Sequence, residues 1–197
     1  MANATSSAET RDRILTATNE LFRQQGFHAT SVSQVVAAAS ATTGSVYHFF
    51  PGGKDELTAE VLRTSGHAYG ELVAGLIRAA PDPAAGMRDA FAGAGQVLAE
   101  SGYFDLCPIG TVAREVATTN DALRQVASAV MTAWSDELAA VFEEAGIEPD
   151  RAVSLATLCI ASIEGGFILA RTHREVSGWL SIGESLAVAI EAELPGR

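Results

Sequence analysis

The chain has 197 residues, a length that suits one large domain or a small domain joined to a medium one. Hydrophobic residues make up 48% of the chain and charged residues 19%, so the composition excludes a disordered chain and supplies a sizeable core. The formal net charge of −11, taken alone, argues against a nucleic-acid partner.

The composition favours helices along almost the whole chain, because Ala, Leu, Glu, Arg and Gln dominate and alternating β-branched runs are nearly absent. Residues 1–9 are expected to form a disordered tail. The first helix is expected over residues 10–25, where Ile14, Leu15, Leu21 and Phe22 form two apolar pairs seven positions apart, and Gly26 ends it.

Two short helices are expected next, and each has a clear cap. Ser31 and Gln34 fit a capping box for a helix from residue 32 to about residue 39. Thr42 is a good N-cap for a second helix that ends near Phe49. The break at Pro51-Gly52-Gly53 then precedes a long helix over residues 54–79.

Further helices are predicted over residues 84–100, 109–117, 121–144 and 151–172, and a last one from Ser177 or Ser181 to residue 193. The chain is therefore predicted to be all-α, with about nine helices and no strands. Residues 10–53 would form an N-terminal domain and residues 54–197 a C-terminal helical bundle.

Residues 152–170 approach the length needed to cross a bilayer and carry a single charge, Glu164. Glu164 near the middle and the adjacent Gly165-Gly166 argue against a membrane span, and no second span or aromatic belt accompanies it. We therefore expect a helix buried by its own protein or by a second copy, and no membrane partner. Because Cys107 and Cys159 form no disulfide framework and no signal peptide precedes the first helix, we expect a cytoplasmic location.

The acidity is unevenly distributed along the chain. Residues 1–65 hold five basic and six acidic residues, whereas the other 132 residues carry a net charge of −10. Residues 10–54 hold four basic residues against two acidic ones, together with His28 and His48. A weakly basic head on an acidic body is compatible with a DNA contact at the head alone.

The two short helices, joined at Ser40-Ala41 and preceded by a supporting helix, match the helix-turn-helix pattern. Hydroxyl side chains and a glycine occupy the first turn of the second helix, which allows close approach to DNA and donation to bases or phosphates. Lys54, the only lysine, follows at the start of a helix, where cation and free N–H groups are expected to hold a phosphate. The residues predicted to contact double-stranded DNA are Thr30, Ser31, Thr42, Thr43, Gly44, Ser45, Tyr47, His48 and Lys54.

The spacing of Gly26-Phe27, Thr30-Ser31-Val32 and the run from Thr43 to Pro51 resembles the N-terminal domain of TetR-type transcriptional regulators. Pro51-Gly52-Gly53-Lys54, Cys107-Pro108-Ile109 and Glu164-Gly165-Gly166 resemble the LmrA/YxaF-like subgroup. The resemblance implies an all-helical homodimer that binds a palindromic operator, usually as a repressor, and releases it when a small molecule fills the C-terminal domain. The chain departs from the family pattern at Ser40, where a glycine is usual, and at Thr43, where lysine or arginine is frequent.

A cavity for this small-molecule effector is expected in the C-terminal bundle, with apolar walls and few polar groups. The predicted lining residues are Tyr69, Phe91, Phe104, Cys107, Arg114, Met131, Trp134, Glu164 and Phe167. The homodimer is expected to form through the last two helices, where Gly165 and Gly166 permit close approach. No cofactor and no metal are expected, because His67 and Glu71 have no third ligand at a suitable spacing.

Several alternatives stay open from the sequence. Tyr47 could pack or contact a phosphate, whereas Phe49 and Phe50 are expected in the core. Glu164 could pair with an arginine at a dimer interface or line the cavity. Cys107 is expected to be a small buried side chain, with a redox-sensing thiol as the alternative. The chain carries none of the common catalytic motifs, so no enzyme is predicted; the competing function is a helical small-molecule-binding protein that does not bind DNA.

Overall fold

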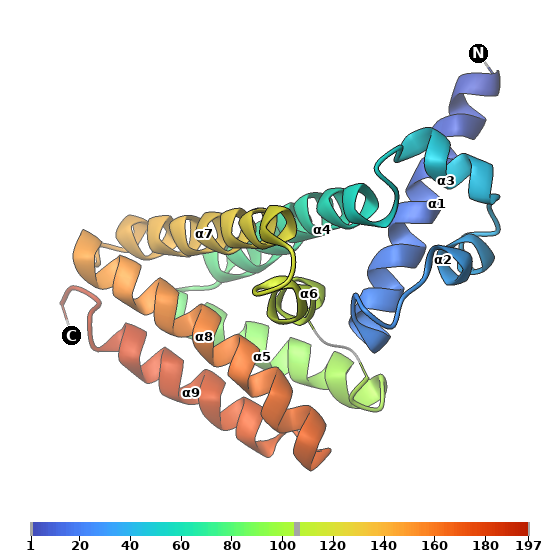
Figure 1. Ribbon diagram of the computed structural model, residues 1–197. Helices are drawn as coiled ribbons and strands as arrows, with labels where there is room; N and C mark the ends of the chain where they lie inside the picture. Colours follow the sequence, from blue (N-terminus) through green and yellow to red (C-terminus); the bar gives the residue numbers. More distant parts are fainter. Residues whose placement is uncertain (1, 105–106, 197) are drawn as a thin grey trace. The chain divides into compact units, whose positions relative to one another are not determined.

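The computed structural model describes residues 2–104 and 107–196 of the chain. Within these ranges every regular element is a helix, which confirms the predicted all-α class (Figure 1). The helices are α1 (Ala2–Gln25), α2 (Val32–Ala38), α3 (Thr43–Phe49), α4 (Gly53–Ala79), α5 (Pro83–Glu100), α6 (Pro108–Val116), α7 (Asp121–Glu144), α8 (Pro149–His173) and α9 (Ser177–Glu191).

The predicted bounds agree with these helices to within about two residues, except at the start of α1. The helix begins at Ala2, so the structure has helix where the sequence predicted a disordered tail. Residues 2–9 contain three alanines and a glutamate, which have favourable helix propensity, and propagation from an existing helix avoids the cost of nucleation.

The chain divides into two compact units that share two continuous helices. The first unit contains α1, α2, α3, the part of α4 up to Gly66, α6 and the part of α7 up to Val130. The second unit contains α5, α8, α9 and the remaining parts of α4 and α7. This division by compactness differs from the boundary predicted at residue 53, because α6 packs on α1. Whether function divides at residue 53 stays a prediction.

The core of the first unit forms where α1, α2 and α3 contact one another. Ile14 and Phe22 of α1, Val35 of α2 and Val46 of α3 are buried, with at most 2% of each side chain exposed. The apolar periodicity predicted for α1 therefore faces this core. Gly26 ends the helix with a φ of 81°, a left-handed conformation that glycine adopts without steric cost.

The turn between α2 and α3 contains a strained residue. Ser40 has a φ of 48°, which places a residue with a Cβ atom in the left-handed region. This is the position at which the TetR-type pattern usually has glycine. The backbone geometry gives a physical reason for that preference.

The second unit is built around Trp179, where α5, α8 and α9 pack together (Figure 1). The indole Nε1 of Trp179 donates a buried hydrogen bond of 2.7 Å to the carbonyl of Phe91, which satisfies the only polar atom of the ring. Gly183 allows the close contact of α5 with α9, because a Cβ atom at this position would lie 2.5 Å from the Cβ atom of Phe91.

The apolar helix α8 is buried on one face only. Ala152, Ala156 and Cys159 are fully buried in the second unit, and burial raises the pKa of the Cys159 thiol to about 12. Its other face exposes Val153, Leu158, Ile168 and Leu169. The helix is long and apolar enough to cross a membrane, and it packs against α9. Its own chain therefore buries one face of α8, and cover of the other face by a second copy stays a prediction.

We predict that Ser40→Gly raises the free energy of unfolding by up to about 1 kcal/mol, because glycine relieves the left-handed strain. Ser33→Gly is the matched control, since the same substitution inside the exposed part of α2 should lower that free energy by about 0.5 kcal/mol. Urea denaturation followed by circular dichroism measures both. Equal effects of the two substitutions would contradict the assignment of strain to Ser40.

Candidate DNA interface and ligand pocket

The exposed surface of α3 carries the residues expected to read DNA. Thr43, Gly44, Tyr47 and His48 are exposed, and Tyr47 has 49% of its side chain accessible. The alternative that Tyr47 is a packed core residue is thereby disfavoured. On the opposite face Val46 is fully buried, so the helix presents its polar side outward from a fixed position.

The start of α3 is held by the predicted N-cap. The hydroxyl of Thr42 accepts a hydrogen bond of 3.1 Å from the backbone N–H of Ser45, and the two side-chain oxygens lie 2.8 Å apart. The cap satisfies one of the free N–H groups of the first turn and orients it. Each hydroxyl still has hydrogen-bonding capacity for a base or phosphate, since a hydroxyl donates once and accepts twice.

Two predicted residues precede α2, and only one lies at the surface. Ser31 is exposed and forms the predicted capping box with Gln34. Thr30 is buried, with 2% of the residue exposed. Its hydroxyl donates a hydrogen bond of 2.7 Å to the carbonyl of Gly26. The prediction that the Thr30 side chain contacts DNA is therefore wrong, because the side chain is buried. Its role is to close the loop after α1.

Lys54 has a partner within the chain, and its predicted phosphate contact stays a prediction. Its ammonium donates a hydrogen bond of 2.6 Å to the carbonyl of Phe27 and lies 3.9 Å from the centre of the Phe27 ring. Burial lowers the pKa of Lys54 from its usual value, while the charges of Asp55 and Glu115 act to raise it. The lysine therefore joins the start of α4 to the loop between α1 and α2, and its cation points to this loop.

Glu115 of α6 is a functional candidate that the sequence analysis missed. Its carboxylate accepts a hydrogen bond of 2.7 Å from the backbone N–H of His28 and covers Gly26, where an added Cβ atom would lie 2.0 Å from the carboxylate Oε1 atom. Asn120, which lies between α6 and α7, donates a hydrogen bond of 2.8 Å to the carboxylate of Asp55 in the first turn of α4. The segment around α6 therefore fixes both the loop after α1 and the start of α4. No local pattern marks Glu115, because its partner lies 87 positions away.

The basic character of the first unit is modest. Arg13 is exposed, and its guanidinium donates a hydrogen bond of 3.2 Å to the carbonyl of Ala39 at the end of α2. Arg11 is paired with Glu60 and lies over the Phe50 ring, which is buried, whereas Phe49 is half-buried. The expectation that both phenylalanines belong to the core holds fully for Phe50 only.

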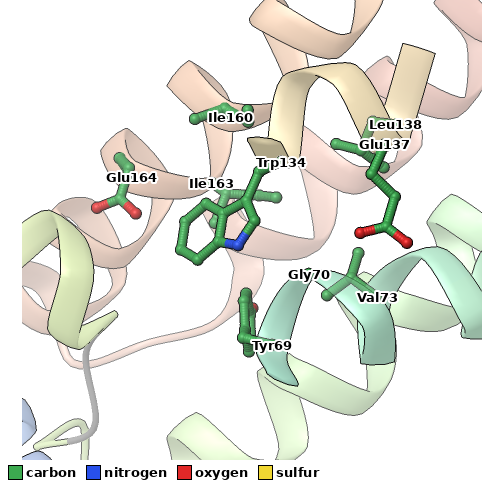
Figure 2. Close-up of a pocket in the computed structure, with 9 residues that line it drawn as sticks. All are labelled: Tyr69, Gly70, Val73, Trp134, Glu137, Leu138, Ile160, Ile163 and Glu164. Carbon is green, nitrogen blue, oxygen red and sulfur yellow. The ribbon is translucent and has the colours of Figure 1, made fainter. Parts of the chain in front are cut away.

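A pocket opens in the second unit between the faces of α4, α7 and α8 (Figure 2). Its volume is about 380 Å³, counting the space at its open mouth. The aromatic rings of Tyr69 and Trp134 stand 5.5 Å apart and inclined by 55°. Gly70 permits this approach, since a Cβ atom there would lie 2.7 Å from the indole of Trp134. The lining residues are Tyr69, Gly70, Val73, Trp134, Glu137, Leu138, Ile160, Ile163 and Glu164.

Three predicted cavity residues line this pocket, namely Tyr69, Trp134 and Glu164. Glu164 therefore lies in the wall of a cavity, and its pairing with an arginine at a dimer interface stays untested. The six lining residues that the sequence analysis missed lie mostly one helical turn from a predicted one, as Val73 does from Tyr69 and Leu138 from Trp134. Extending each predicted residue by its i+4 neighbour would have found these two.

The other predicted cavity residues lie elsewhere. Phe91 of α5 and Phe167 of α8 pack on Trp179 of α9, at ring distances of 4.6 and 4.7 Å, and fill the core of the second unit. Phe104 is 57% exposed, and Met131 is half-buried but does not line the pocket. The apolar periodicity of a helix shows which residues lie on the same face. It does not show whether that face lines a cavity or packs in the core.

Cys107 and Arg114 belong to the first unit and do not line this pocket. Cys107 is buried and accepts a hydrogen bond of 3.4 Å from the backbone N–H of Gly110, so its sulfur caps α6. Arg114 is exposed. His67 and Glu71 form an exposed pair 3.4 Å apart, and the described part of the chain holds no group of three or more residues suited to a metal.

Comparison with known proteins agrees with this geometry. Residues 14–61 match the family described as bacterial regulatory proteins, tetR family, and residues 83–184 match the C-terminal domain of LmrA/YxaF-like transcriptional regulators. The chain belongs to the TetR family of transcriptional regulators. The resemblance to the LmrA/YxaF-like subgroup is confirmed.

Two curated relatives cover nearly the whole of this TetR-family regulator. The HTH-type transcriptional regulator YxaF of Bacillus subtilis is 31% identical, over 94% of this chain and 97% of its own length. An HTH-type regulator of Mycobacterium tuberculosis is 34% identical, over 95% and 97% respectively. Neither the family nor these relatives are enzymes, since they are transcriptional regulators.

Solved structures show the same fold. A TetR regulatory protein from Rhodobacter sphaeroides superposes with a TM-score of 0.80 at 20% identity, over 90% of this chain and 97% of its own. A TetR-family regulator from Cytophaga hutchinsonii has a TM-score of 0.76 at 21% identity, over 98% of each chain. At this identity the likeness is one of fold.

We predict that Thr42→Ala lowers the free energy of unfolding by about 0.5–2 kcal/mol, because the N–H of Ser45 loses its acceptor. Thr42→Ser is the matched control and should keep most of that free energy, since it retains the hydroxyl. Urea denaturation measures both variants. If alanine and serine gave the same denaturation midpoint, the hydroxyl cap would not stabilise α3.

Proposed function

We propose that this TetR-family regulator is a cytoplasmic repressor. It binds a palindromic DNA operator as a homodimer through α3 and leaves it when a small molecule fills the pocket lined by Tyr69 and Trp134. The observation that carries the proposal is the pairing, in one chain, of a capped α3 with an exposed polar face and a pocket in the second unit. The alternative without DNA binding leaves that polar face without a role.

The DNA contact is supported by the chemistry of α3. A recognition helix in the major groove presents side chains from its first turns to base edges. In this chain those side chains are Thr43, Ser45 and Tyr47, with Gly44 allowing the backbone to approach closely. Hydroxyl groups donate to and accept from either bases or phosphates, so they suit this position without a net positive charge.

The homodimer is supported by an unpartnered apolar surface on α8 and α9. It consists of Val153, Leu158, Ile168 and Leu169 on α8 with Leu180 and Val188 on α9, each with 44–54% of its side chain exposed. Exposed apolar patches of this kind mark contact surfaces. A two-fold axis would set α8 and α9 against the same pair in a second copy and complete a four-helix interface.

Release by a ligand is supported by the continuity of α4. The first turn of α4 holds Lys54 against the loop after α1, and the same helix supplies Tyr69, Gly70 and Val73 to the pocket wall. A ligand that fits only one position of this helix would change the spacing of the two α3 helices in a dimer. Operator half-sites are about 34–36 Å apart, so a change in that spacing weakens binding.

We predict that the triple substitution Thr43→Ala, Tyr47→Ala and His48→Ala weakens operator binding at least tenfold, since each specific base contact contributes about 1–3 kcal/mol. The probe is the DNA upstream of the protein's own coding sequence, titrated by fluorescence anisotropy. The matched control is Thr132→Ala with His67→Ala, two exposed positions outside α3. Unchanged affinity in the triple variant would exclude α3 as the reading surface.

We predict that Leu158→Asp with Val188→Asp converts the dimer into a monomer at micromolar concentration, because charges would be buried at the apolar interface. Leu76→Asp is the control, since Leu76 is equally exposed but lies on α4. Analytical ultracentrifugation gives the mass of each variant. A dimer that persists in the double variant would place the interface elsewhere.

A further inference from the structure

The pocket in the second unit has an uneven chemistry. Its walls hold two aromatic side chains, Tyr69 and Trp134, and aliphatic residues from three helices. The only charged residues among its lining are the acids Glu137 and Glu164, and no Lys, Arg or His is among them. In Figure 2 the indole of Trp134 stands at the centre, with Glu164 on the side of its six-membered ring and Glu137 on the other side.

The two carboxylates have different surroundings. Arg78 approaches Glu137 to 3.6 Å and is hydrogen-bonded more closely to Glu144, at 3.0 Å. Glu137 therefore shares a surface cation with a second acid. Glu164 lies in α8, between Ile163 and Gly165, and its Oε1 atom is shielded from solvent. A carboxylate in such a position interacts with a bound charge through a lower effective dielectric than water.

We infer that the effector of this pocket is a compact organic cation with an apolar body, such as a quaternary or protonated amine that carries an aromatic or branched group. Its positive centre would lie against the faces of Trp134 and Tyr69, which attract cations through their ring quadrupoles, and within reach of Glu164. An anionic ligand would meet two like charges. The inference rests on the proposed function, in which this pocket receives the effector.

Size and long-range charge agree with this ligand class. The volume of about 380 Å³ includes the space at the open mouth, so the enclosed part is smaller and a compact ligand is favoured. The residues beyond position 65 carry a net charge of −10, and a field of that sign raises the local concentration of cations. The small enclosed space disfavours large effectors, and the negative charge disfavours anionic ones.

Three probes of similar shape and different charge test the inference. They are benzyltrimethylammonium, its neutral carbon isostere neopentylbenzene, and phenylacetate as an anion. Isothermal titration calorimetry on the full-length dimer should give the tightest binding for the ammonium, by at least tenfold over the neutral isostere, and no detectable binding for phenylacetate. Equal affinity for the first two probes, or tighter binding of phenylacetate, would overturn the inference without any substitution in the protein.

The variant Glu164→Gln keeps the shape of the side chain and removes its charge. It should weaken benzyltrimethylammonium binding at least tenfold and leave the neutral isostere unchanged. Glu148→Gln is the matched control, since Glu148 is exposed just before α8 and does not line the pocket. If Glu164→Gln left the ammonium affinity unchanged, the assignment of the charge contact would be wrong. If that variant did not fold, the three-probe series on the unsubstituted protein would still decide the charge preference.

Operator binding separates this inference from the proposed function. If another, uncharged compound releases the operator while benzyltrimethylammonium does not bind, the cation preference is overturned and the repressor function stands. If benzyltrimethylammonium binds with the expected dependence on Glu164 but leaves operator affinity unchanged, the cation site stands and ligand-controlled release fails. If both the cation preference and the repressor function hold, benzyltrimethylammonium binds the protein and lowers its affinity for the operator.

Discussion

The hydrogen bond from the Lys54 ammonium to the carbonyl of Phe27 connects the start of α4 to the loop after α1. Glu115 holds the same loop from a third helix, through the N–H of His28. The ammonium also lies over the Phe27 ring, where the cation gains a further attraction. Two charged groups therefore converge on the short loop that leads from α1 to α2.

Under the proposed function, this loop lies at one end of the path of the effector signal. α4 carries Lys54 in its first turn and part of the pocket wall further along the same helix, so a displacement of the wall would act on the loop through one continuous helix. Glu115 would provide a second contact to the loop, since α6 packs on α1 in the same unit. A contact made by charged groups is either formed or broken within a small displacement, because hydrogen bonds weaken steeply with distance and angle.

The sequence was sufficient for features that depend on neighbours in the chain. The caps at Ser31 and Thr42 and the left-handed glycine at position 26 follow from residues within four positions, and each is found as predicted. Features that depend on distant partners were not accessible. Thr30 was placed at the DNA because its buried partner in the loop could not be seen from the sequence. Phe91 was placed at the cavity because helical phase does not reveal which neighbour a face meets.

The weak basicity of the first unit is compatible with the proposed release of an operator. Thr43 carries no charge at the start of α3, and one donor of the Lys54 ammonium is used by Phe27. Phosphate neutralisation supplies much of the affinity of protein–DNA complexes, so each half-site of the proposed operator would be correspondingly weak. Two half-sites bound by the proposed dimer would offset this weakness. Allosteric coupling is typically about 1–3 kcal/mol, and a complex of modest affinity is the kind that a coupling of this size can dissociate.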